Sequence, residues 1–74
     1  MDNLNLQQMT ESISKSYFNR PFKHKAYFNP RLRTTGGRYI LNTHNIEVNA
    51  KQYNKFGEKA IEDIIKHELV QSMT

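Results

Sequence analysis

The fold of this chain is decided by its final stretch, Gly57-Glu-Lys-Ala-Ile-Glu-Asp-Ile-Ile-Lys-His-Glu-Leu-Val-Gln-Ser-Met-Thr74. At about 100° per residue, four apolar side chains fall on one arc of a helix: Ile61, Ile64, Ile65 and Leu69. The stretch therefore predicts an amphipathic helix whose apolar arc faces the core. Glu68 projects into the middle of that arc. Because a carboxylate at an apolar centre is costly to bury without a partner, its position is the first indication of a functional site.

His67 and Glu68 begin the pattern His-Glu-x-x-His, in which two histidines one helical turn apart bind zinc. In that pattern the intervening glutamate acts as general base on a metal-bound water. His67 lies on the flank of the apolar arc, and Gln71 occupies the fifth position, where a second histidine would stand. The sequence thus supplies one candidate metal ligand, His67, and one candidate catalytic carboxylate, Glu68.

The length and composition of the chain indicate one small domain spanning residues 1–74. A chain of this length buries only roughly 60% of the surface that is exposed when it is unfolded. Because it has no cysteine, neither a disulfide framework nor a zinc ribbon can stabilise the fold. A hydrophobic content of 36% suffices for one modest core and argues against wholesale disorder. No apolar run approaches the roughly 20 residues of a membrane span, and the first residues lack the features of a secretory signal. We therefore expect a cytoplasmic protein that does not associate with membranes.

Hydrophobic periodicity predicts an α+β fold that begins with a helix over residues 3–17, where apolar side chains recur at spacings of three and four. Alternation of apolar and polar residues then predicts three strands, at residues 22–28, 38–42 and 46–48. The short connection between the last two strands predicts an antiparallel hairpin. We expect the three strands to form one antiparallel sheet.

A short helix is predicted at about residues 50–56, with Asn49 as its N-cap and Gly57 as its stop. Gly36 and Gly37 permit backbone angles that other residues resist, so they predict a tight turn or bulge ahead of the second strand. A phosphate-cradling loop fits poorly there, because no Gly-Lys-Ser/Thr follows and the next element is a strand.

Two further histidines have interpretations that involve no metal. His24 lies on the apolar side of its predicted strand, which is typical of a hydrogen-bonded core or edge histidine. His44 falls in the polar connection between two strands and is interpreted as a turn residue.

Basic side chains gather between Lys15 and Arg38, and the chain has a net charge of +4. Such a segment forms a solvated face or attracts nucleic acid or another anion. Four aromatic residues are interleaved with it, as in surfaces that bind single strands: Tyr17, Tyr27, Phe28 and Tyr39. Packing in the core is the alternative role for most of these rings.

Several runs of residues give the chain a family resemblance: Asn29-x-Arg31-Leu32-x-x-Thr35-Gly36-Gly37-Arg38-Tyr39, then Asn45-Ile46-Glu47-x-Asn49, then Gly57, and then Ile64-Ile65-x-His67-Glu68-Leu69. In this order and spacing they resemble the SprT-like family, and the chain looks most similar to the small SprT-like proteins of Gram-positive bacteria. The resemblance covers the chain from about Leu4 to Leu69. It implies the first part of a zincin-type metallopeptidase domain, with zinc as cofactor and protein as substrate.

The resemblance also implies roles for individual residues. His67 would be the first zinc ligand and Glu68 the general base. The family would have a second histidine ligand at the position of Gln71 and a third beyond Thr74, where many members also carry a Cys-rich zinc ribbon. Related eukaryotic members are DNA-dependent proteases that act on protein crosslinked to DNA, which makes DNA-associated protein a substrate class by analogy.

Because a Gln carbonyl oxygen is a poor ligand for zinc, we expect a truncated domain that binds zinc weakly or not at all and has no peptidase activity on its own. A nucleic-acid-binding module that uses the basic segment from Lys15 to Arg38 is one alternative. An interaction module is another, in which an unfinished apolar face pairs with another chain or with a second copy.

Overall fold

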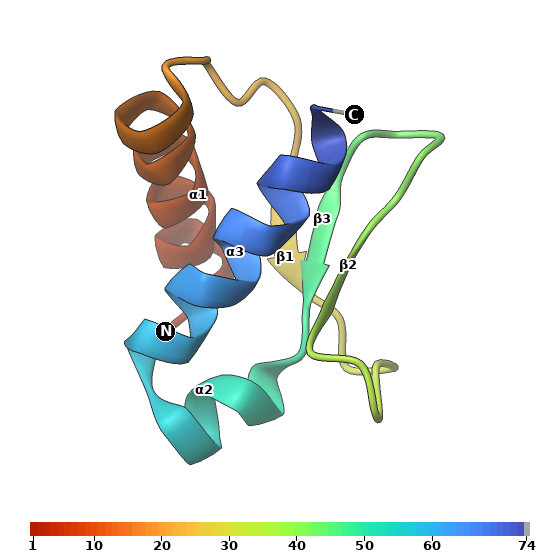
Figure 1. Cartoon of the computed structure of the whole chain (residues 1–74). Coiled ribbons are helices and arrows are strands. Elements are labelled where there is room, and N and C mark those ends of the chain that lie inside the picture. Colours follow the sequence, from red (N-terminus) through yellow and green to blue (C-terminus); the bar gives the residue numbers. More distant parts are fainter. Residues whose placement is uncertain (74) are drawn as a thin grey trace.

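The chain forms a helix, then three strands and then two further helices in the computed structural model, which describes residues 1–73 (Figure 1). The elements of that part are α1 (Asn3–Phe18), β1 (Ala26–Phe28), β2 (Gly37–Tyr39), β3 (Ile46–Val48), α2 (Ala50–Phe56) and α3 (Glu58–Ser72). The predicted α+β class and the order of elements are confirmed. None of the helices within residues 1–73 is long and apolar enough to cross a membrane.

Helix α1 begins and ends on side-chain and backbone caps that the sequence supplies. The Asp2 carboxylate accepts a hydrogen bond from the Asn5 N–H at 2.8 Å, and the Asn5 side chain accepts one from the Asp2 N–H, which forms a capping box. Asn19 ends the helix in the left-handed conformation, with φ of 54°. The helix therefore runs one residue further than the predicted span of residues 3–17.

The sheet has the strand order β1-β3-β2. β3 pairs antiparallel with β2, as the predicted hairpin requires, but it pairs parallel with β1. The sheet is therefore mixed and not wholly antiparallel as expected. The connection over residues 29–36 carries the chain from one edge of the sheet to the other, so β3 returns between the first two strands (Figure 1).

The first two strands are shorter than predicted, because β3 offers a ladder of only three residues, Ile46–Val48. β1 begins at Ala26, not at residue 22, and β2 ends at Tyr39. Just before β1, the Lys25 N–H donates to the Asn45 side chain at 2.9 Å, so a side chain satisfies this backbone group where a longer strand would have continued the ladder.

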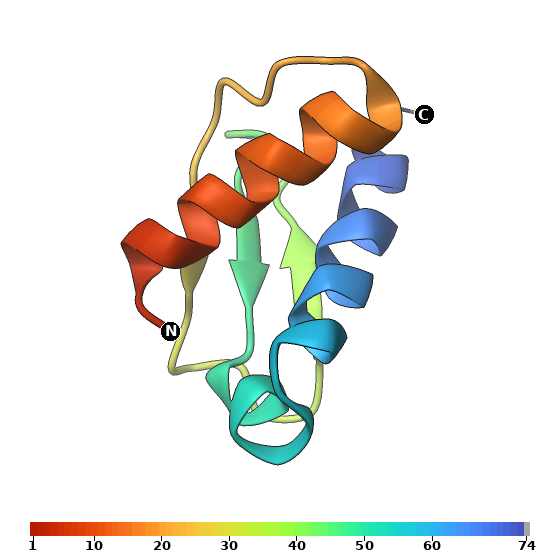
Figure 2. The same ribbon diagram turned by 90° about the vertical axis from the view of Figure 1, so that its left-hand side faces the viewer.

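Helices α1 and α3 cover one face of the sheet, α1 against β1 and α3 against β2 and β3 (Figure 2). The buried core lies between these layers: Leu6, Ile13, Ala26, Ile46, Val48, Ile61, Ile65 and Leu69. Side chains alternate between the two faces of a strand, so Tyr27, Arg38 and Glu47 point away from the helices. We call this the outer face of the sheet.

Helix α2 is capped as predicted. Asn49 is buried, and its side chain accepts a hydrogen bond from the Lys51 N–H at 3.0 Å while its amide donates to the Thr35 carbonyl at 3.1 Å. Gly57, with φ of 80°, ends α2 and precedes α3. A positive φ at this position favours glycine, which is why the chain can turn from one helix directly into the next.

Candidate functional site on helix α3

Glu68 is buried in the apolar arc of α3, as the helical periodicity predicts. Its exposed fraction is 5%, and Ile61, Ile65 and Leu69 are buried on the same side of the helix. Within residues 1–73 the Glu68 carboxyl forms no hydrogen bond or ion pair, although its oxygen atoms are not completely enclosed. Burial raises the pKa of this carboxyl above its ordinary value, and the charge of neighbouring His67 offsets the rise only in part.

His67 and Gln71 lie on the exposed flank of α3, one helical turn apart, as predicted. The Gln71 amide nitrogen lies 3.2 Å from His67 Nε2, a distance at which the amide donates a hydrogen bond to this ring nitrogen. In that arrangement the Nε2 lone pair is used by the amide and is not offered to a metal.

The side chains at this place do not fit a catalytic zinc ion. Such a site takes three protein ligands, mostly imidazole, carboxylate or thiolate. Within residues 1–73 no three His, Cys, Asp or Glu side chains are placed to share a metal ion. What α3 offers is one imidazole from His67, one carboxamide from Gln71, and the carboxyl of Glu68 on the buried side.

Gly37 brings β2 close to α3 beside this site. A Cβ atom at position 37 would lie 2.6 Å from Ile64 Cγ2 and 3.9 Å from Glu68 Cγ. The predicted turn or bulge at Gly36 and Gly37 is found only in part: the chain bends at Gly36, but Gly37 lies within β2 and neither glycine has a positive φ. The glycine is required because helix and strand approach so closely that no side chain fits between them.

A second buried carboxylate, which the periodicity did not single out, lies on the outer face of the sheet. Glu47 is 5% exposed and accepts hydrogen bonds from Tyr27 Oη at 2.8 Å, Asn29 Nδ2 at 3.0 Å and Arg38 Nε at 2.5 Å. Burial acts to raise the pKa of Glu47, but these hydrogen bonds and the Arg38 charge outweigh it and hold the pKa below its ordinary value. The hydrogen bond to Glu47, followed by burial, raises the pKa of Tyr27.

We call Tyr27, Asn29, Arg38 and Glu47 the outer-face cluster. Tyr27 and Arg38 lie directly opposite Glu47 on the two neighbouring strands. The register of the predicted hairpin could have revealed part of this cluster, because it places Arg38 directly across from Glu47. The contribution of Tyr27 could not be found in this way, because it depends on the parallel pairing of β1 with β3.

The other sequence-predicted residues are dispersed. His24 precedes β1 and is exposed, so the prediction of a core or strand-edge histidine is wrong; its ring instead lies 5.1 Å from that of His44, between ring centroids. His44 is the expected turn residue, with φ of 63°. The basic side chains between Lys15 and Arg38 are all exposed.

The aromatic residues of the basic segment do not form one exposed row. Phe28 and Tyr39 pack against the core, and Tyr27 belongs to the outer-face cluster. Tyr17 is 65% exposed and lies on α1, where the Lys66 ammonium sits 4.0 Å from its ring centroid. Core packing, the alternative that the sequence left open, is therefore found for two of the four rings.

Comparison with known proteins identifies relatives along almost the whole chain. A match to the SprT-like family covers residues 6–73. Over 69 residues, which are 93% of this chain, it is 74% identical to "Protein SprT-like" of Staphylococcus saprophyticus, 70% identical to that of Staphylococcus carnosus and 61% identical to that of Geobacillus kaustophilus.

These aligned residues make up only 45%, 46% and 46% of the three relatives, so the chain spans about half the length of the curated proteins it matches. No solved structure matches the sequence. The family match and the relatives agree with the motifs that surround Gly37, Glu47 and His67, and the chain belongs to the SprT-like family.

Proposed function

We propose that this chain carries half of the site of a SprT-like metallopeptidase domain, with Glu68 as its general base and His67 as its first metal ligand. We further propose that the chain by itself binds zinc weakly or not at all and does not hydrolyse peptide bonds. The observation that supports the proposal best is the buried carboxyl of Glu68, which has no partner within residues 1–73 and lies beside an exposed imidazole.

The cost of burying Glu68 is the first support for a functional role. A fully buried polar group without a partner costs about 1–3 kcal/mol, and the Glu68 oxygens bear only part of this cost because they keep some contact with water. A fold selected for stability alone would still place an apolar residue in this arc. A general base works best when its pKa lies near the operating pH, and burial moves the pKa of Glu68 upward in that direction.

The donor set supports the second half of the proposal. A carboxamide oxygen is a hard, weak ligand for zinc, and the Gln71 amide nitrogen already contacts His67 Nε2. One imidazole alone does not form a three-ligand site. We therefore assign to this chain the placement of Glu68 and His67, and derive no catalytic step from it.

Isothermal titration of the purified chain with zinc chloride tests the proposal. We expect no stoichiometric binding at submicromolar concentration and no cleavage of an unfolded protein substrate such as casein. The chain has three histidines, so the variant His67→Ala assigns any heat that is observed. A stoichiometric, submicromolar site that disappears in His67→Ala would overturn the proposal of weak binding.

Binding to single-stranded nucleic acid is a second candidate, favoured by the exposure of every basic side chain between Lys15 and Arg38. Fluorescence anisotropy with a labelled oligonucleotide tests it. Binding should weaken steeply as salt is raised, because phosphate contacts release counterions. Absence of binding at low salt, or binding that is indifferent to salt, contradicts this candidate.

A further inference from the structure

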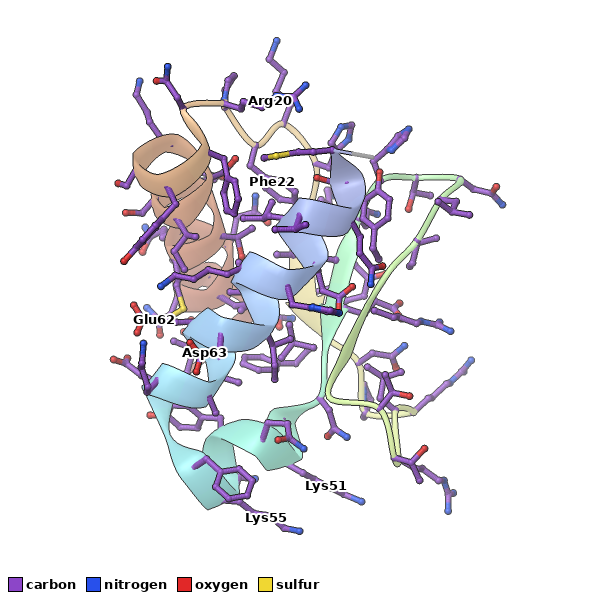
Figure 3. The ribbon with its side chains drawn as sticks, in the orientation of Figure 1. Arg20, Phe22, Lys51, Lys55, Glu62 and Asp63 are labelled. Carbon is purple, nitrogen blue, oxygen red and sulfur yellow. The ribbon has the colours of Figure 1, made fainter. Side chains whose placement is uncertain are left out.

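A cavity of ≈ 130 Å³ lies where helices α1 and α3 end, away from the outer-face cluster. The segment that joins α1 to β1 forms one wall, and Arg20 and Phe22 come from it (Figure 3). The hairpin between β2 and β3 contributes His44, and the end of α3 contributes Leu69 and Met73. The cavity is therefore assembled from segments that are far apart in the sequence.

The polar residues that line this cavity within residues 1–73 are basic or carry a hydroxyl group. Arg20, His24 and His44 all line it, and none of the described residues that do so is acidic. A guanidinium donates through five N–H groups, and an imidazole donates through at least one in either protonation state. The apolar part of the wall is formed by Phe22, Leu69 and Met73.

Arg20 is held over the cavity by the end of helix α1. The Ser14 hydroxyl donates to the Arg20 carbonyl at 2.7 Å, and the Arg20 N–H donates to the Ser14 carbonyl at 3.3 Å. The left-handed conformation of Asn19 reverses the direction of the chain at the end of α1, which brings the Arg20 backbone back to Ser14. Because both backbone groups of Arg20 are hydrogen-bonded, the side chain begins at a defined place beside the cavity.

The two imidazoles are also positioned by specific contacts. The backbone N–H of His44 donates to the Ile40 carbonyl at 2.8 Å, and His44 Nδ1 is hydrogen-bonded to the Tyr39 hydroxyl. In the tautomer in which Nδ1 accepts from this hydroxyl, Nε2 carries the proton and is the ring nitrogen that can donate to a ligand. The His24 ring packs edge-on against Phe22 and lies 5.1 Å from the His44 ring between centroids. Two imidazoles and a guanidinium thus line one cavity, and no side-chain carboxylate from residues 1–73 lines it with them.

We propose that this cavity binds a small oxyanion, a phosphate or carboxylate group, through Arg20, His24 and His44. The volume is several times the roughly 30 Å³ that one water occupies in the liquid, so an anion of this size fits. Charge-assisted hydrogen bonds from a guanidinium are the strongest that a protein offers to such groups. The proposal is independent of Glu68 and of zinc, since neither Glu68 nor His67 lines the cavity.

Nuclear magnetic resonance titration of the intact chain tests the proposal, with inorganic phosphate and acetate as probes. Ionic strength and pH are held constant, with chloride replacing the probe. We expect saturable changes in chemical shift that cluster on Arg20, His24 and His44. The variant Arg20→Gln should weaken binding of the probe by about tenfold or more. Saturation by phosphate alone assigns a phosphate group as the ligand, and saturation by acetate alone assigns a carboxylate.

The variant Arg33→Gln is the matched control, because Arg33 is an exposed arginine of the same basic segment that does not line the cavity. It should bind the probe like the parent chain. His44→Asn removes the imidazole and keeps a residue that tolerates positive φ, so it should weaken binding while its thermal midpoint stays close to the parent value. Shifts that never saturate, or equal weakening in Arg20→Gln and Arg33→Gln, would overturn the proposal.

Discussion

Gly37 and Ile64 are in such close contact that a Cβ atom at position 37 would lie 2.6 Å from Ile64 Cγ2. The same atom would lie 3.0 Å from the Glu47 carbonyl oxygen, which belongs to the neighbouring strand and cannot move aside alone. The contact fixes how closely α3, which carries His67 and Glu68, approaches strand β2. Packing of the candidate site on the sheet therefore depends on the absence of a side chain at one position.

Gly37→Ala should destabilise the fold by about 1–3 kcal/mol, since overpacking forces the helix and the strand apart. Gly36→Ala is the matched control, because a Cβ atom there would meet Ile64 Cδ1 at 3.4 Å, close to an ordinary contact. Urea unfolding followed by circular dichroism measures both variants. Equal stability of the two variants would show that the close contact does not matter.

The sequence was sufficient to predict features that depend on neighbours along one helix. The periodicity around Ile61 and Ile65 places Glu68 inside the apolar arc, and the structure finds it buried there. The capping role of Asn49 and the stop at Gly57 follow from local conformational preference in the same way. These features are local, so one stretch of sequence contains the information.

The strand order could not be predicted in this way. Alternation over residues 22–28 is compatible with a long strand, but a strand extends only where a partner offers hydrogen bonds, and β3 offers three residues. The outer-face cluster depends on this order, because Tyr27 meets Glu47 only when β1 lies beside β3. For the same reason His24 and His44, which come from separate segments, were interpreted one at a time and not as neighbours.

Glu68→Gln should make the chain more stable at pH 8, by about 1 kcal/mol, because it removes a charge from an apolar site. The folded-state pKa of Glu68 is raised, so between the pKa of the unfolded chain and that of the folded chain the native state binds more protons. The stability of the parent chain therefore falls as the pH rises through this window, and its difference from Glu68→Gln grows.

Urea unfolding of both chains at pH 4 and pH 8 measures the difference. Glu62→Gln is the control on the same helix, because Glu62 lies outside the buried arc (Figure 3). It should change the free energy of unfolding by less than about 0.5 kcal/mol at either pH. A Glu68→Gln variant that is less stable than the parent at pH 8 would show that the carboxylate is stabilised in the fold.

Glu47→Gln should cost about 2 kcal/mol at pH 7, because the neutral amide loses the charge interaction with Arg38 and cannot accept all three hydrogen bonds. Arg38 is 56% exposed at its side chain and regains water, which keeps the loss below that of a fully buried pair. The folded-state pKa of Glu47 is lowered, so its contribution is present above the unfolded pKa and is lost as the pH falls through the folded pKa.

Asp63→Asn is the matched control for this loss. The pair Lys59–Asp63 has an N–O distance of 3.4 Å, and both side chains are more than half exposed, at 72% and 62%. Its removal should cost less than about 0.5 kcal/mol. Thermal unfolding of the parent chain and of both variants at pH 7 and at pH 2 measures these losses. The difference in stability between the parent chain and Glu47→Gln should shrink in acid. A difference that stays constant would contradict the assigned protonation state of Glu47.

Gln71→His should raise the affinity of the chain for zinc by about tenfold or more, since a second imidazole one turn from His67 replaces an amide that is a poor ligand. Isothermal titration with zinc measures the gain. His67→Ala in the Gln71→His background should abolish it, because the pair is then broken. Glu62→His adds a histidine to the same helix on a different side and should leave the affinity unchanged. If Gln71→His binds zinc no more tightly than Glu62→His, His67 is not oriented to share a metal with position 71, and its assignment as a ligand fails.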